Sequence, residues 1–234
     1  MKIAHRSSLA NLPLIVSVGC ALLPFLAVHA AYLLAAGSGY VEWCMPYIDS
    51  CTSISATGRR PPASFVFRGV MLPSAMLMML FWWLHWFWLE RMHSRVRSRH
   101  AMLALGWVAC IGLVLYVTVL GEVGDLWRLQ RRIGTVLFFS FTFLAQLLLA
   151  GMLRNLTDNP VALAVGGRLL RLCRIILLIG LFSVLMQLLS EDWHDRIEDA
   201  IEWQLALLLQ LNFLLTAGLW RRGDWRLVFR RSDP

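Results

Sequence analysis

Long apolar runs alternate with short polar segments along the whole chain, and this pattern predicts the secondary structure. Six runs hold about 20 mainly apolar residues each, the length that an α-helix needs to cross a bilayer. They lack the period-two alternation of membrane β-strands and are about twice as long, which disfavours a β-barrel. We therefore predict an all-α fold with six transmembrane helices in a single domain. The predicted spans are residues 12–36, 69–89, 101–120, 133–153, 169–189 and 201–220.

The composition narrows the class of protein. Hydrophobic residues make up 59% of the 234 residues and charged residues only 15%, whereas a typical soluble domain is about half apolar and about a quarter charged. So much apolar surface cannot be buried inside a soluble globule of this length. The composition therefore argues against a soluble enzyme, a disordered chain and a nucleic-acid binder.

The basic residues predict the orientation of the chain. If the N-terminus is cytoplasmic, the inner segments carry 15 Lys and Arg residues and the outer segments 7, while Asp and Glu number 4 inside and 10 outside. The positive-inside rule then places both termini in the cytoplasm. A cleaved signal peptide is the alternative reading of the first apolar run. The compact loops and the Arg bias are compatible with a bacterial inner (plasma) membrane.

Residues 221–234 form a basic tail with interleaved aromatic side chains. Such a segment is predicted to lie on the surface of anionic lipid. Binding of a cytosolic protein partner is the alternative.

The first outer loop, residues 37–68, carries the densest set of polar groups, and we predict that it is structured. Its hydroxyls, backbone N–H groups and arginines suit a phosphate, which a guanidinium binds with two parallel hydrogen bonds. A cap that only seals the bundle, or a catalytic loop, remains possible on the same residues. Cys44 and Cys51 lie in this loop, and an oxidising compartment favours a disulfide between them; two free thiols are the alternative.

Polar residues near the last span are the other candidates. Glu202 opens an apolar run, so we expect it to face the bundle interior and to pair with Arg131 or Arg132. His194, Glu198 and Glu202 share one helix face at a spacing of four residues, which could ligate a metal. Solvated charges at the start of a helix are the simpler interpretation, so we expect no metal and no cofactor.

Three short motifs support a resemblance to a known family. They are Thr52-Ser53-Ile54-Ser55-Ala56-Thr57-Gly58 with Pro61-Pro62 and Phe67-Arg68, then Gly121-Glu122 with Arg131, Arg132 and Gly134, and finally Ile201-Glu202-Trp203. In this order they resemble the Frag/DRAM/Sfk family of six-span membrane proteins, which includes the Golgi factor that remodels GPI-anchor lipids and the amino-terminal part of the yeast ceramide-remodelling protein. The DRAM-like members have Asp where this chain has Ala56, so no role of that acid carries over.

The resemblance implies a role with membrane lipids, but no single reaction, because its members include remodelling factors, lipid-asymmetry regulators and scaffolds. Our leading hypothesis is a protein that binds, senses or helps remodel membrane lipids through an outward-facing headgroup site. One alternative is a lipid acyltransferase or hydrolase with Ser53 or Ser55 as nucleophile and His29 or His194 as base, and another is a scaffold that uses the basic tail. The predicted headgroup site comprises Ser53, Ser55, Gly58, Arg59, Arg68, Glu122, Arg132 and Glu202.

Overall fold

Six long helices form the part of the molecule that the structure describes. The computed structural model describes residues 11–92 and 95–222, apart from the side chain of Glu191. Each long helix is apolar enough to cross a membrane, and the described part of the chain contains no strand, so the predicted all-α, six-span fold is confirmed. The long helices are α1 (Leu12–Gly37), α4 (Ala63–Arg91), α5 (Val96–Thr118), α6 (Asp125–Arg154), α7 (Pro160–Leu189) and α8 (Glu191–Arg222).

The helices extend beyond the apolar runs that predicted them. Helix α4 begins at Ala63, so the last six residues of the predicted outer loop are helical, and the Ser64 amide already donates to Arg60 O at 2.9 Å. Helix α6 begins at Asp125, after Gly124 with a φ of +130° that suits glycine. Backbone geometry and hydrogen bonds set these ends, whereas hydropathy marks only the part that lipid surrounds.

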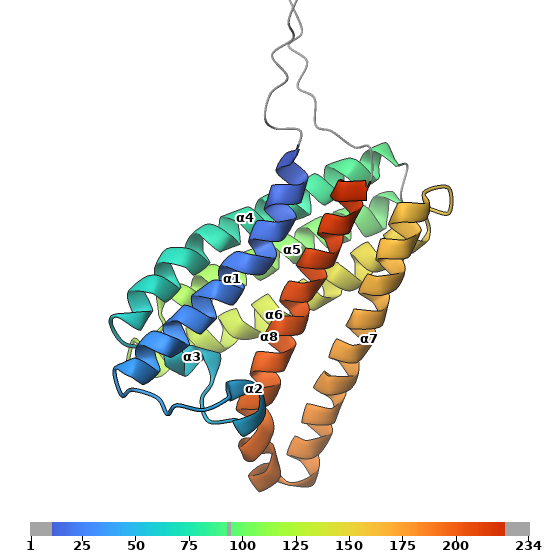
Figure 1. Cartoon of the computed structure of the whole chain (residues 1–234). Helices are drawn as coiled ribbons and strands as arrows, with labels where there is room; N and C mark the ends of the chain where they lie inside the picture. Colours follow the sequence, from blue (N-terminus) through green and yellow to red (C-terminus); the bar gives the residue numbers. More distant parts are fainter. Residues whose placement is uncertain (1–10, 93–94, 223–234) are drawn as a thin grey trace, which may run out of the picture.

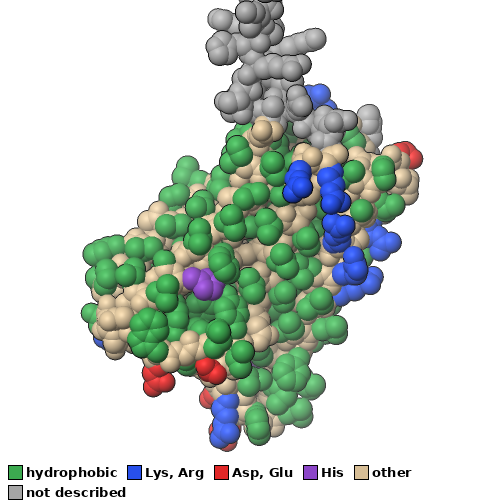
Figure 2. Space-filling model, viewed as in Figure 1, with side chains coloured by type: hydrophobic (Ala, Val, Ile, Leu, Met, Phe, Trp, Pro, Cys, Tyr) green, Lys and Arg blue, Asp and Glu red, His purple; other side chains and the backbone are tan. Residues whose placement is uncertain are grey.

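Successive long helices run in opposite directions (Figure 1). The ends of α1 and α8 at Leu12 and Arg222 lie at one end of the bundle, which we call the termini end. The first outer loop and the turn at Ser190 lie at the other, the loop end. Figure 2 shows most basic side chains of this face towards the termini end and most acidic ones towards the loop end. Which compartment each end faces stays a prediction, and the tail from residue 223 onwards lies outside the described residues.

Small residues allow α5 and α6 to pack closely. A Cβ atom added at Gly134 would lie 2.6 Å from the backbone nitrogen of Tyr116 and 2.7 Å from Gly112 O. Close approach of backbones at glycines is a common way for membrane helices to associate. This contact fixes α6 against α5, and α5 in turn packs on α4 and α4 on α1.

Helix α7 is the least enclosed helix. Only 17% of its most apolar window is buried within the protein, against 39–44% for the other five spans. It packs on α6 and α8, while α6 and α8 make few contacts with each other. The space between α6 and α8 at the loop end is therefore bounded on one side by α7, and the candidate site lies there.

The first outer loop folds over the loop end of α8, as the prediction of a structured loop requires. It contains two short helices, α2 (Pro46–Asp49) and α3 (Ile54–Thr57), and a disulfide joins Cys44 to Cys51. The indole nitrogen of Trp203 donates to Thr52 O at 2.8 Å, and the Gln204 side-chain amide donates to Tyr47 O at 2.9 Å. These bonds hold α2 and the segment just before α3 against α8.

Candidate functional site

A polar cavity of about 680 Å³ opens at the loop end between α3, α6, α7 and α8. We call it the vestibule. Its lining combines hydroxyl groups, carboxylates and one histidine, and Val136 and Ser140 on its α6 side are exposed on the surface of the protein. The polar residues of the lining are Ser53, Ser55, Thr135, Ser140, Ser183, His194, Glu198, Asp199 and Glu202.

A smaller apolar pocket of about 40 Å³ continues from the vestibule into the bundle. Glu202 and Phe139 line both cavities, so they mark the junction. Beyond the junction the wall is almost entirely apolar and includes Met71 and Met78, whose flexible side chains adapt easily to a changing shape. The site therefore has a wide polar part at the end of the bundle and a narrow apolar part at membrane depth.

Ser53 and Ser55 form a hydrogen-bonded chain with Arg59. Ser53 Oγ accepts from the Ala56 amide at 3.1 Å and so caps α3. The two serine hydroxyls lie 3.1 Å apart, and Arg59 Nη2 donates to Ser55 Oγ at 3.0 Å. Arg59 makes no ion pair with any described residue, and a guanidinium has five N–H donors. Most of its donors are thus left for a ligand.

Glu202 does not have the basic partner that we expected. No ion pair within 4 Å joins it to Arg131, to Arg132 or to any other described residue. The reason is the position of α6, which the vestibule separates from α8 at this end. The Glu202 carboxyl group instead faces the Ile54 backbone amide and interacts electrostatically with Asp199 and Arg59.

Five predicted headgroup residues lie outside the lining of both cavities. One is Arg59, which is exposed and contacts the vestibule only through its hydrogen bond to Ser55. Arg68 donates through Nη2 to Leu120 O and so ties α4 to the turn after α5. Gly58 is buried, and an added Cβ atom would lie 2.8 Å from side-chain atoms of Leu120 and Phe67. Glu122 and Arg132 are exposed. Arg68 and Gly58 thus support the loop that carries Ser53 and Ser55.

His29 also lies outside the vestibule lining. Its Nδ1 lies 2.7 Å from Phe25 O and its Nε2 lies 3.0 Å from the Tyr47 hydroxyl. This pattern fits an Nδ1–H that donates to the carbonyl and an Nε2 that accepts from Tyr47, whose pKa is raised by burial. His29 therefore joins α1 to α2, and its hydrogen bonds reach neither Ser53 nor Ser55.

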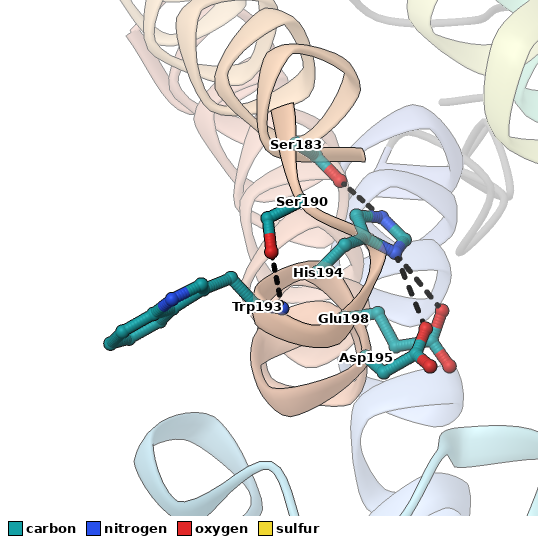
Figure 3. A network of polar contacts seen from close by, with 6 residues as sticks. All are labelled: Ser183, Ser190, Trp193, His194, Asp195 and Glu198. Atoms are coloured by element: carbon teal, nitrogen blue, oxygen red, sulfur yellow. Dashed lines mark hydrogen bonds and ion pairs between the residues drawn. The ribbon is translucent and has the colours of Figure 1, made fainter. Parts of the chain in front are cut away.

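A second cluster in the vestibule includes a residue that sequence analysis missed (Figure 3). Ser183 Oγ lies 3.3 Å from His194 Nε2. On the other side of the ring, His194 Nδ1 lies 3.6 Å from Glu198 Oε2 and 3.9 Å from Asp195 Oδ1. Ser183 is flanked by apolar residues in the sequence, and only the sharp turn between α7 and α8 brings it back to His194. Ser183 lies seven residues before Ser190, which is at the turn. This distance of about two helical turns is the one sequence signal that could have identified it.

Two kinds of chemistry are compatible with this cluster. The ligand atoms of His194, Asp195 and Glu198 all lie within 4.8 Å of one another, a geometry that could hold a metal ion. The same histidine stands between a hydroxyl and two carboxylates, an arrangement that suits proton transfer. Both involve side chains at the mouth of the vestibule.

Comparison with known proteins identifies the family. A family model described as the Frag1/DRAM/Sfk1/Cwh43P N-terminal domain matches residues 13–218, which include most of every predicted span. Comparisons with curated proteins and with solved structures found no match. The resemblance carried by the three short motifs is thus confirmed over nearly the whole chain. The protein is an integral membrane protein that belongs to the Frag1/DRAM/Sfk1/Cwh43P N-terminal domain family.

Proposed function

We propose that the protein binds a membrane lipid with its headgroup in the vestibule. The observation that carries this proposal is the junction at Glu202, where a polar cavity of about 680 Å³ meets an apolar pocket. A lipid has the same division between a polar head and an apolar chain. Val136 and Ser140 line the vestibule and are exposed on α6, which supports entry of a lipid from the side of the bundle.

The charges favour a headgroup that carries both an anionic and a donor group. Arg59 and the hydroxyls of Ser53 and Ser55 are suited to a phosphate, because guanidinium–phosphate hydrogen bonds are charge-assisted. Glu202 and Asp199 are suited to an ammonium or to sugar hydroxyls on the same headgroup. A zwitterionic or glycosylated phospholipid offers a phosphate to the first group of side chains and an ammonium or hydroxyls to the second. In this proposal Arg68 and Gly58 position the loop, and Glu122 and Arg132 have no direct contact with the headgroup.

We also propose that the loop end faces the extracytoplasmic side of a bacterial inner membrane. The excess of Lys and Arg at the termini end supports this orientation through the positive-inside rule. The disulfide between Cys44 and Cys51 supports it as well, because disulfides persist in oxidising compartments. The bound lipid would then come from the outer leaflet of that membrane.

Native mass spectrometry of protein released gently from its own membrane tests the headgroup site. We expect wild-type protein to retain one phospholipid class, and Glu202→Gln and Arg59→Gln to weaken that binding about tenfold or more. A hydrogen bond to a charged group contributes about 1.5–3 kcal/mol, which corresponds to that loss.

Arg60→Gln is the matched control. Arg60 is the neighbouring exposed arginine, and its guanidinium lies 5.1 Å from the Tyr40 ring centroid instead of at Ser55. This variant should retain the lipid as wild type does. Circular dichroism of all four proteins confirms that they are folded. Equal retention by all four, or a non-selective lipid mixture on each, contradicts a headgroup site at Glu202 and Arg59.

A further inference from the structure

At the mouth of the vestibule a serine hydroxyl, a histidine ring and a carboxylate lie next to one another in that order. His194 presents one ring nitrogen to the Ser183 hydroxyl at 3.3 Å and the other to the Glu198 carboxylate at 3.6 Å. In Figure 3 the carboxylates of Glu198 and Asp195 point towards the same nitrogen, on the side of the ring opposite Ser183. Ser183, His194 and Glu198 all line the vestibule.

The turn between α7 and α8 fixes this arrangement. The Trp193 amide donates to Ser190 Oγ at 3.4 Å, and the His194 amide donates to Ser190 O at 3.1 Å, so that α8 starts with a defined first turn. Glu198 follows His194 by four residues and therefore lies on the same helix face. The His194 side chain is only 14% exposed. The imidazole is thus enclosed between Ser183 and Glu198. Both of these side chains line the vestibule and can be reached from it.

We propose that Ser183, His194 and Glu198 form a catalytic triad that transfers an acyl group from an ester-linked lipid held in the vestibule. This inference rests on the proposed lipid site. An activated serine requires a base within hydrogen-bond reach and a third group that orients the base, and such distances are often longer without substrate. Ser183 and His194 are within hydrogen-bond distance at 3.3 Å. Glu198 at 3.6 Å and Asp195 at 3.9 Å make charge contacts with the other ring nitrogen, and a bound substrate would have to bring Glu198 closer for it to orient the base.

The reaction needs only an ester lipid and an acceptor hydroxyl. Ser183 Oγ forms a bond to the ester carbonyl carbon while its proton moves to His194 Nε2. The bond from that carbon to the alkoxy oxygen then breaks, His194 returns the proton to this oxygen, and a lysolipid leaves. A hydroxyl of a second lysolipid, or water, gives its proton to Nε2 and takes the acyl group, and Ser183 recovers its proton. Glu198 and Asp195 stabilise the imidazolium that forms in each half-reaction.

The hydrogen bonds favour Ser183 over the two serines of the first outer loop. Ser53 and Ser55 bond to each other, to the Ala56 amide and to Arg59, and no hydrogen bond joins either hydroxyl to a histidine in residues 11–92 and 95–222. Ser183 Oγ has its hydrogen bond with His194. The loop serines therefore suit headgroup contact, and Ser183 suits attack.

Covalent labelling of the full-length protein in lipid nanodiscs tests the triad. An alkyl fluorophosphonate probe modifies activated serines, and peptide mass spectrometry locates the modified residue. We expect labelling of Ser183, with Ser53, Ser55 and Ser140 of the same vestibule unlabelled. His194→Gln should lower the labelling rate about 100-fold or more, because general-base catalysis contributes about 10²–10⁴-fold. Glu198→Gln should lower it less, because Asp195 remains.

Gln187→Ala is the matched control, because Gln187 is exposed one turn beyond Ser183 on α7 and does not line the vestibule. It should be labelled at the wild-type rate. Absence of Ser183 labelling in wild type, or an unchanged rate in His194→Gln, overturns the triad. The triad is also overturned if the wild-type protein binds Zn²⁺ stoichiometrically, His194→Gln does not, and Ser183 is unreactive in both. The cluster would then be a metal site.

The outcomes separate the triad from the lipid site. Ser183→Ala should abolish labelling, whereas Glu202→Gln and Arg59→Gln should weaken lipid retention, so the two measurements depend on different side chains. Lipid retention without Ser183 labelling overturns the triad alone. Ser183 labelling without selective lipid retention overturns the headgroup site and leaves the activated serine in place.

Discussion

The Tyr47 hydroxyl connects the first outer loop to α1 through a hydrogen bond with His29 Nε2. Tyr47→Phe removes the hydroxyl, and we expect a loss of about 1 kcal/mol in the free energy of unfolding. Burial raises the pKa of Tyr47, so the neutral hydroxyl stabilises the fold at every pH below its unfolded value of about 10, and this stability is lost as the pH rises through the folded pKa.

Chemical unfolding at neutral pH in detergent measures this loss. Tyr40→Phe is the control, since its exposed ring lies under Arg60 and its hydroxyl makes no bond comparable to that with His29. Equal unfolding free energies for the two variants would show that the Tyr47 bond contributes nothing.

Individual site residues were predictable where they interrupt an apolar pattern. Glu202 stands out at the start of an apolar run, and the hydroxyl-rich segment around Ser53 stands out in a loop; the structure places both in the vestibule lining. Ser183 has no such contrast, because one serine among leucines usually bonds to its own helix. His194 was already a candidate from the sequence, but its pairing with Ser183 becomes visible only once the direction of α8 relative to α7 is known.

Among the elements, the pair formed by α5 and α6 depends most on side-chain size. Gly134→Ala would bring a methyl group to 2.6 Å from the Tyr116 backbone nitrogen. We expect a loss of about 1–3 kcal/mol, because backbone atoms cannot move aside as a flexible side chain does.

Thermal unfolding of Gly134→Ala and Gly151→Ala provides the comparison. Gly151 lies on the same helix, and nothing occurs within 4 Å of an added Cβ atom there, so that variant should match or exceed wild type in stability. A Gly134→Ala protein as stable as Gly151→Ala would disprove the close packing of α5 on α6.

The existence and order of the helices followed from hydropathy, but their ends did not. The apolar runs mark the part of each helix that lipid surrounds, whereas α4 and α6 begin where a proline or a glycine changes the backbone direction. This difference matters for the site: Arg68 was expected in a loop facing a headgroup, and the early start of α4 turns it towards Leu120.

For the whole molecule, the orientation in the membrane is directly testable. Val123 is 92% exposed at the loop end, and Thr157 is exposed in the turn between α6 and α7 at the termini end. Cys20, Cys110 and Cys173 are buried and the other two cysteines are bonded, so background labelling should be low. A membrane-impermeant maleimide applied to intact cells should label Val123→Cys and spare Thr157→Cys.

Permeabilised cells are the control, because both introduced thiols should then react. Labelling of Thr157→Cys alone in intact cells would reverse the proposed orientation and move the vestibule to the cytoplasmic leaflet. The topology of six crossings would be unchanged, since it depends only on the number of helices.

The global arrangement of charge was predictable, but the vestibule was not. An even number of spans requires both termini at one end, and the Arg bias predicts which compartment each end faces. The cavity arises because α6 and α8 diverge while α7 bridges them, and such a divergence depends on packing between distant segments that no local pattern encodes.

Entry of the lipid past Val136 and Ser140, which line the vestibule and are exposed, is part of our proposal and would determine how the site is filled. A ligand that enters from the bilayer diffuses in two dimensions, so its occupancy depends on its mole fraction in the leaflet and not on its concentration in water. Diluting proteoliposomes at constant lipid composition would leave the site equally filled. Lateral sorting of lipids into domains would then regulate the protein as strongly as any change in their synthesis.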